Sequence, residues 1–154
     1  MALHLVAVGR LRPCFRDAAD LYLERLQRFV PVTEREVRDA GRAGNAVAQQ
    51  REEAERLRAA IPRSARTVAL DLDGTPWSSE QLATRLAQWR EPGRDTAFVV
   101  GGATGLDAVL LEGADERWSL GPLTLPHELA RVLVAEQLYR AATILAGQPY
   151  HKAG

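Results

Sequence analysis

The chain has 154 residues, of which 46% are hydrophobic and 26% are charged, as in an ordinary globular domain. Its formal net charge is zero, so bulk electrostatics do not indicate a nucleic-acid-binding protein. No apolar run approaches the ~20 residues of a membrane span, the first residues lack the pattern of a signal peptide, and the single Cys14 fits a reducing compartment, so we expect a cytoplasmic protein.

The charge is unevenly distributed along the chain. Residues 1–66 carry 13 Arg and 9 acidic residues, whereas residues 67–154 carry 7 basic and 11 acidic residues. A basic N-terminal half could face phosphates. From charge alone, solvated helix faces are the simpler interpretation.

Hydrophobic periodicity predicts alternating strands and helices in the first half of the chain. The first apolar run stops at Gly9, and the first helical pattern stops before Pro31. The predicted elements are a strand at Leu3–Val8, a helix from about Ala18 to Phe29, a strand at Val32–Val37, a polar loop at Asp39–Asn45 and a helix at Ala46–Ala60.

The alternation continues in the second half. Ser78 and Gln81 have the spacing of a capping box, which is typical of a helix start. The predicted elements are a strand at Thr67–Leu72, a turn at Asp73–Pro76, a helix after Ser78 through Trp89, a strand at Thr96–Val100, a short strand at Arg117–Leu120 and a helix at Pro126–Leu145. The pattern predicts one α/β domain over residues 1–154, with a mostly parallel sheet and flanking helices.

The last predicted helix has two notable features. Pro126 fits its first position, and the N–H groups that follow make a natural anion site. The helix is also apolar nearly all round, and such a helix must be covered on more than one face. In a chain of this size, we expect a partner subunit to provide part of that cover.

A glycine-rich segment, Gly101–Gly105, follows the strand at Thr96–Val100. Ligands of α/β proteins bind at the carboxyl ends of strands, and glycines let the backbone approach a ligand closely. A branched side chain at Gly102 is therefore expected to fill space that the ligand needs. The pattern matches neither the dinucleotide fingerprint nor the phosphate loop, so a tight turn explains it equally well.

Other candidate residues give weaker signals. Asp71 and Asp73 flank a strand end and could bind a ribose or act in acid–base chemistry, although turn capping is the simpler role for Asp73. The three histidines are far apart in the sequence, so no metal site is expected. Near the C-terminus, Tyr150, His151 and Lys152 could stack on a base and hold a phosphate, although terminal residues often fray.

Short motifs are spread over the whole chain: VAVG near the start, Leu70-Asp71 with Gly74-x-Pro76-Trp77, Val99-Val100-Gly101-Gly102-x-x-Gly105-Leu106, Trp118-Ser119-Leu120, Leu123-Thr124-Leu125-Pro126-His127, Arg131-Val132-Leu133, Ala135–Ala141 and Pro149-Tyr150-His151-Lys152. Together they resemble the bacterial family that methylates N3 of a pseudouridine in 23S ribosomal RNA. This family, methyltransferase H, is a small branch of the SPOUT superfamily.

The resemblance implies features that periodicity does not show. It implies a deep trefoil knot in the C-terminal part, a homodimer whose knotted regions pack together, and S-adenosylmethionine bound in the knot loops. The Gly121-Pro122 pair fills positions that vary in the family, so backbone contacts transfer more safely there. The cofactor contacts carried over by motif are Leu70, Gly102, Gly121, Pro122, Leu123, Thr124, Leu125 and Pro126.

The implied reaction requires a weakly acidic ring N3–H to lose its proton. His151 is the best candidate for the base by residue type, and Arg140 or Lys152 could stabilise charge on the ring carbonyls. We expect Tyr150, His151 and Lys152 to contact RNA, either in the large subunit or in the assembled ribosome. Two alternatives remain open: a SPOUT enzyme acting on transfer RNA, and a nonenzymatic nucleotide- or RNA-binding module.

Overall fold

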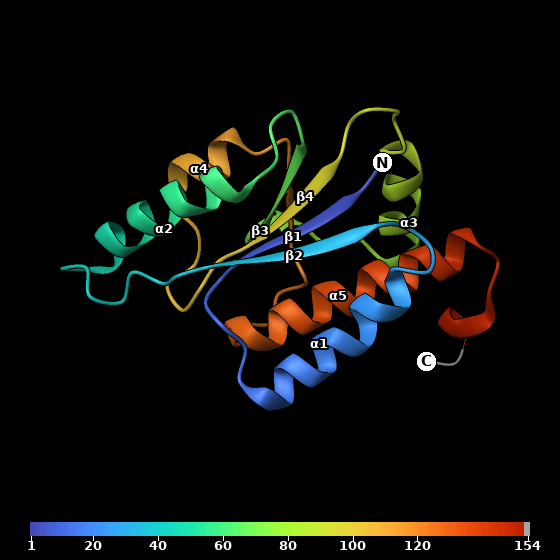
Figure 1. The fold of residues 1–154 in the computed structure, drawn as a ribbon, viewed down its shortest axis with the longest axis horizontal. Coiled ribbons are helices and arrows are strands. Elements are labelled where there is room, and N and C mark those ends of the chain that lie inside the picture. The colour runs from blue at the N-terminus through green and yellow to red at the C-terminus, as the bar shows by residue number, and fades with distance from the viewer. Residues whose placement is uncertain (153–154) are drawn as a thin grey trace.

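A five-stranded parallel sheet forms the centre of the molecule, with the strand order β2-β1-β4-β3-β5 (Figure 1). The computed structural model describes residues 1–152, without the side chains of residues 151 and 152. The strands are β1 (Leu3–Val8), β2 (Val32–Val37), β3 (Arg66–Thr75), β4 (Thr96–Val100) and β5 (Glu116–Trp118). The helices are α1 (Pro13–Leu26), α2 (Ala46–Ala60), α3 (Ser79–Gln88), α4 (Ala108–Gly113), α5 (His127–Leu145) and the short 3-10 helix η1 (Pro149–Lys152).

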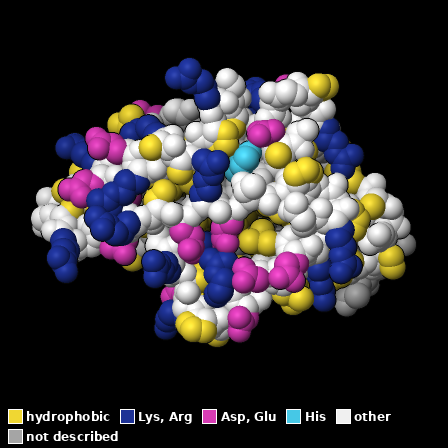
Figure 2. Space-filling view, in the orientation of Figure 1, with side chains coloured by type: hydrophobic (Ala, Val, Ile, Leu, Met, Phe, Trp, Pro, Cys, Tyr) yellow, Lys and Arg dark blue, Asp and Glu magenta, His cyan; other side chains and the backbone are white. Residues whose placement is uncertain are grey.

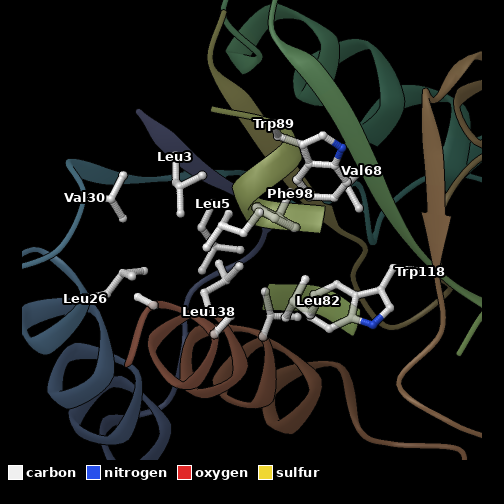
Figure 3. Close-up of a cluster of buried hydrophobic side chains, with 14 of the residues drawn as sticks. Leu3, Leu5, Leu26, Val30, Val68, Leu82, Trp89, Phe98, Trp118 and Leu138 are labelled. Atoms are coloured by element: carbon white, nitrogen blue, oxygen red, sulfur yellow. The ribbon is translucent and has the colours of Figure 1, made fainter. Parts of the chain in front are cut away.

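Helices cover both faces of the sheet. The helices α1, α3 and α5 lie on one face, and α2 and α4 lie on the other (Figure 1). Because successive side chains of a strand point to opposite faces, the buried strand β1 contributes to both layers. Leu5 packs with Phe98 and Leu138 in the first layer (Figure 3), whereas Val6 packs with Leu57 of α2 in the second.

Several predicted boundaries are confirmed, namely those of β1, β2, α2 and β4. The helix α1 begins at Pro13, five residues before the predicted start, because a proline is well suited to the first turn of a helix. The short α4 was not predicted, since its six residues are too few to show a period. It is capped by Asp107, whose Oδ2 accepts hydrogen bonds from the backbone N–H groups of Val109 (3.0 Å) and Leu110 (3.2 Å).

The predicted turn at Asp73–Pro76 is wrong, because β3 continues to Thr75 and pairs there with Trp118 of β5. The pairing register shifts between Leu70 and Thr75, which marks an irregularity in the strand. A Cβ atom on Gly74 would lie 2.8 Å from the backbone of Arg117, so the absence of a side chain lets the two strands approach.

Helix α5 is covered mostly by the chain's own elements. It packs between α1 and α3 over the sheet, and η1 lies against its C-terminal end (Figure 1). Val134, Leu138 and Ala141 are fully buried within one chain. The apolar circumference of this helix therefore does not by itself require a partner subunit. Its first helical residue is His127, and Pro126 is the N-cap rather than the first residue of the helix.

None of the helices in residues 1–152 is long and apolar enough to cross a membrane.

Candidate functional site

A hollow lies at the carboxyl ends of β3, β4 and β5, with about 680 Å³ of empty space including its open mouth. The carboxyl edge is where open α/β sheets bind ligands. Its walls come from the end of β3, the glycine segment after β4, the segment after β5 and the first turns of α5. Six of the predicted cofactor contacts line it: Leu70, Gly102, Gly121, Leu123, Thr124 and Leu125.

Two predicted contacts lie outside the lining of the hollow. Pro122 is exposed to solvent, and Pro126 caps α5. Asp71, a candidate ribose ligand, and Gly101 and Gly105 of the candidate glycine segment also line the hollow. Leu72, His127 and Ala130 line it as well, although the sequence analysis had not assigned them. The glycines belong to the Gly-Gly-x-x-Gly pattern, and His127 follows Pro126 in a quoted motif, so both signals were present in the sequence.

The glycine segment folds back on itself at the wall of the hollow. The backbone N–H of Gly105 donates to the carbonyl oxygen of Gly102 at 3.1 Å. A Cβ atom on Gly101 would lie 2.8 Å from the carbonyl carbon of Gly105, which real Cβ atoms essentially never do. A Cβ atom on Gly102 would instead meet Val8 Cγ1 of β1 at 3.0 Å. The closest constraint on Gly102 is therefore the neighbouring strand, rather than the ligand space that we had expected a side chain to fill.

The segment from Gly121 to Leu125 forms a second wall between β5 and α5. The buried hydroxyl oxygen of Ser119 accepts a hydrogen bond from the N–H of Gly121 at 3.1 Å, which fixes the start of the segment. Gly121 has a φ of +115°, a conformation that residues with a side chain rarely adopt. Leu123 is 75% exposed, so a ligand in the hollow could cover an apolar side chain that the chain itself leaves open.

Polar groups of the hollow come from Asp71 and from the start of α5. Asp71 Oδ1 accepts a hydrogen bond from the N–H of Asp73 at 3.1 Å, and its other oxygen lies 3.8 Å from Arg117 Nη1. The capping residue of this pair is thus Asp71 rather than Asp73. His127 and Ala130 bring the first turn of α5 to the hollow, and no side chain caps that helix. Free N–H groups at a helix start favour negatively charged ligand groups.

The C-terminal tail is docked on α5 at least as far as Tyr150. Tyr150 donates a hydrogen bond from its hydroxyl to Glu136 Oε1 at 3.1 Å, and its ring centroid lies 4.7 Å from that of Tyr139. Arg140 donates to the same carboxylate oxygen from Nε (2.9 Å) and Nη2 (2.6 Å) and lies over the Tyr150 ring. Burial, reinforced by Glu136, raises the pKa of Tyr150 to about 12.

The hydrogen bonds from Arg140 to Glu136 also raise the pKa of Arg140, so this guanidinium stays charged and engaged. The side chains of His151 and Lys152 lie outside the described part of the chain, although their backbone continues η1.

The structure does not bring the predicted catalytic residues to the predicted cofactor contacts within one chain. The hollow meets the first turns of α5, whereas Arg140 lies in the C-terminal half of this helix and η1 lies against that half (Figure 1). At 1.5 Å per residue, the 19-residue helix is about 28 Å long, and Arg140 lies about 20 Å along it from His127. No metal-binding group of three His, Cys, Asp or Glu side chains occurs within the described residues.

Comparisons with known proteins identify the family of the chain. A family described as "Predicted SPOUT methyltransferase" matches residues 1–151. The chain is 46% identical over 156 residues to Ribosomal RNA large subunit methyltransferase H of Xanthomonas euvesicatoria pv. vesicatoria (strain 85-10), covering 99% of this chain and 100% of that protein. The protein of the same name from Xanthomonas oryzae pv. oryzae (strain PXO99A) is also 46% identical, with the same coverage.

Two solved structures share the fold. A probable methylase family protein from Haemophilus influenzae Rd KW20 has a TM-score of 0.59 and 13% identity, over 96% of this chain and 69% of that chain. A probable methyltransferase from Bordetella pertussis Tohama I has a TM-score of 0.57 and 16% identity, over 91% of this chain and 93% of that chain. At such identities the likeness supports the architecture alone.

Proposed function

The chain belongs to the SPOUT methyltransferase family, and we propose that it transfers a methyl group from S-adenosylmethionine to N3 of a pseudouridine in 23S ribosomal RNA of the large subunit. The observation that carries the proposal is the hollow at the carboxyl ends of β3, β4 and β5, where six of the cofactor contacts implied by the family resemblance lie together. Family membership implies that the C-terminal segment is tied into a deep trefoil knot. Because the proposed substrate is ribosomal RNA, we propose that the protein is cytoplasmic.

The residues of the hollow suit S-adenosylmethionine. Leu70, Leu106 and Trp118 provide apolar walls for a flat base, and the glycine segment offers backbone that a ligand can approach closely. The Asp71 carboxylate can accept hydrogen bonds from ribose hydroxyls, and the N–H groups at the start of α5 can bind a carboxylate. When bound, this group supplies a methyl that is already activated, so the protein's main task is alignment.

The acceptor nitrogen must lose a proton, and we propose that His151 accepts it, because an imidazole with an unperturbed pKa near 6.5 can do so at neutral pH. Lys152 would then stabilise charge on the ring or hold a phosphate. Arg140 is already held by Glu136 and stacked on Tyr150, so we assign it to positioning the tail rather than to the chemistry.

The separation along α5 supports a homodimer. Because Tyr150 of the tail packs against α5 from Glu136 onward, about 14 Å or more along the helix from His127 at the hollow of its own chain, we propose that the tail of one protomer serves the hollow of its partner. The arrangement can be tested by mixing a chain that lacks its last five residues with a full-length variant that cannot bind the methyl donor. Each is inactive alone, and the mixture should recover activity if tails act across protomers. If each tail serves its own chain, mixing restores nothing, and light scattering that finds only monomers at micromolar concentration would also overturn the dimer.

The function itself is tested in two steps. Calorimetry with S-adenosylmethionine, after treatment with a chelator, should show binding without metal; protein that gives no heat and no thermal shift would remove the basis of the proposal. Methyl transfer is then measured on large ribosomal subunits, on assembled ribosomes and on bulk transfer RNA, with the product nucleoside identified by mass spectrometry. Transfer to transfer RNA alone would favour the alternative SPOUT activity, and binding without transfer would favour a nonenzymatic module.

A further inference from the structure

The hollow uses only three of the five strand ends at the carboxyl edge of the sheet. All five strands are parallel, so β1 and β2 end at the same edge, beside β4. Arg10 follows β1 after one glycine, and Arg38 directly follows β2. The N–H of Gly9 donates to the carbonyl oxygen of Val37 at 2.7 Å, so the two chains leave the sheet side by side. Arg42 lies in the same loop as Arg38.

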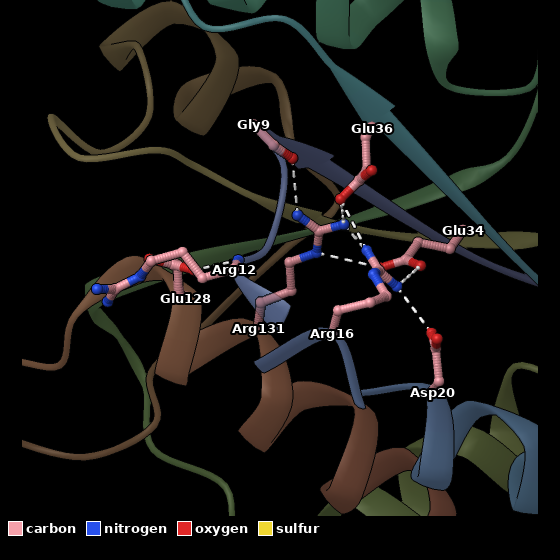
Figure 4. Close-up of polar contacts among 8 residues, drawn as sticks. All are labelled: Gly9, Arg12, Arg16, Asp20, Glu34, Glu36, Glu128 and Arg131. Atoms are coloured by element: carbon pink, nitrogen blue, oxygen red, sulfur yellow. Dashed lines mark hydrogen bonds and ion pairs between the residues drawn. The ribbon is translucent and has the colours of Figure 1, made fainter. Parts of the chain in front are cut away.

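The acidic groups of β2 near this edge are already paired with other arginines. Glu34 and Glu36 of β2 both contact Arg131, which is buried, and Arg16 (Figure 4). Arg16 Nη1 lies 2.6 Å from Glu34 Oε1, and Arg16 Nη2 lies 2.8 Å from Glu36 Oε2. The charges of these two carboxylates are therefore neutralised by arginines of α1 and α5.

A second pair completes this neutralisation. Arg12 Nε lies 2.8 Å from Glu128 Oε1, and the Arg12 backbone N–H donates to the other oxygen of that carboxylate (Figure 4). By contrast, Arg10, Arg38 and Arg42 are exposed, and within the described residues none of their guanidinium groups makes an ion pair or a hydrogen bond. The three guanidinium groups are consequently available to an anion from outside the chain.

The loop that carries two of these arginines is held in place. Arg56 Nη1 of α2 donates to the carbonyl oxygens of Arg38 (2.8 Å) and Asp39 (2.9 Å). The buried carboxylate of Glu53 accepts the N–H of Ala40 at 2.9 Å. Asp39, the one acid within the loop, accepts the N–H of Gly41 at 3.0 Å. Figure 2 shows arginine side chains gathered over α2 and the loop before it, with acidic side chains among them.

We propose that Arg10, Arg38 and Arg42 form a shelf that binds the phosphate backbone of the RNA substrate beside the methyl-donor hollow. The inference rests on the proposed function. Adjacent strands lie about 4.8 Å apart, so the shelf begins one strand away from β4 and continues along the same edge. An RNA that presents a base at the mouth of the hollow passes its backbone over the neighbouring strand ends. Guanidinium groups without carboxylate partners suit phosphates in that position.

The test replaces all three shelf arginines by glutamine and compares the variant with a matched control. The control replaces Arg28, Arg63 and Arg90 by glutamine; these are equally exposed, make no ion pair among the described residues and precede strands, so they lie at the opposite edge of the sheet. Both variants lose the same charge. Binding of large-subunit ribosomal RNA is measured over a range of salt concentrations, with calorimetry of S-adenosylmethionine as a check on the hollow.

Three lost phosphate contacts should make the slope of log affinity against log salt shallower by about 2 and weaken binding by about 100-fold near 0.1 M salt. The control should keep the wild-type slope, and both variants should bind S-adenosylmethionine normally. The shelf is overturned if the shelf variant keeps the wild-type salt slope, or if the control loses as much of that slope. It is also overturned if the wild-type chain does not bind RNA.

Methyl transfer by the wild type is measured alongside and tests the proposed function separately. If the wild type methylates ribosomal RNA while the shelf variant keeps its slope, the shelf alone fails. If RNA binding depends on the shelf but no methyl group is transferred, the proposed function fails and the shelf stands.

Discussion

Replacing Gly101 by alanine tests whether the tight glycine segment shapes the hollow. The added Cβ atom would lie 2.8 Å from the carbonyl carbon of Gly105 and 3.0 Å from its oxygen. Both are backbone atoms, which cannot rotate away as a side chain can. The turn between Gly102 and Gly105 must therefore move, and both of these residues line the hollow.

The size of the effect follows from the crowding. Overpacking of this kind costs about 1–3 kcal/mol of unfolding free energy. In a protein of this size, each kcal/mol lowers the melting temperature by about 2–4 °C, so we expect a decrease of about 2–12 °C. A ligand at 100 times its Kd stabilises a folded protein by about 2.7 kcal/mol, and the variant should lose most of that gain with S-adenosylmethionine.

Thermal unfolding with and without S-adenosylmethionine, together with calorimetry, measures both effects. Gly44→Ala is the matched control, because its Cβ atom would meet nothing within 4 Å. Gly102→Ala should be milder than Gly101→Ala, because the Val8 side chain that it meets at 3.0 Å can adjust. If Gly101→Ala melts and binds like Gly44→Ala, the glycine segment does not shape the site, and the reasoning is refuted.

Three further predictions concern α5 and the tail. Val134→Glu should unfold the protein rather than dissociate a dimer, since this side chain is fully buried within one chain and an unpaired buried charge costs several kcal/mol; circular dichroism should show loss of the folded state. Tyr150→Phe should remove a phenolate titration near pH 12 in ultraviolet absorbance. Because the pKa of Tyr150 is raised in the folded protein, its neutral hydroxyl stabilises the docked tail fully at any pH below the ordinary pKa of 10.0. This contribution is lost as the pH rises through the folded-state pKa of about 12. Deleting the last five residues should leave the calorimetric affinity for S-adenosylmethionine nearly unchanged while methylation of ribosomal RNA collapses, and normal methylation by that variant would contradict a role for the tail.

The regular elements of the fold were the most predictable part. The strands β1 and β4 are mostly apolar and buried because helices cover both faces of a parallel sheet, and such runs have clear ends. The continuation of β3 through Gly74 was not predictable, because Asp-Gly-Thr-Pro also describes a turn. Its outcome depends on the backbone of Arg117, more than 40 residues away in the sequence. Local chemistry alone cannot decide between a turn and a strand when a distant neighbour supplies the pairing.

Site residues were predictable to the extent that backbone conformation required particular residue types. Gly102 and Gly121 are glycines for reasons of close approach or positive φ, and such requirements leave a mark in the sequence. Asp71 was a candidate only because it lies near a strand end, and His127 carries no comparable mark, because many surface residues of this type have no role. The shelf arginines were hidden for a different reason: the sequence shows every arginine, but only the structure shows which ones are already paired.

The spatial relation between two predicted groups of site residues was not available from the sequence. The cofactor contacts at 121–126 and the tail at 150–152 lie on either side of a single helix, and the sequence does not show how that helix is oriented. That helix is 19 residues long and straight enough to hold its ends about 28 Å apart (Figure 1). Within one chain, the hollow therefore lies at the start of α5, and the tail packs along its C-terminal half. In the proposed two-fold dimer, the tail of one protomer would complete the site at the hollow of the other, and the proposed shelf beside β1 and β2 would guide the RNA past that hollow.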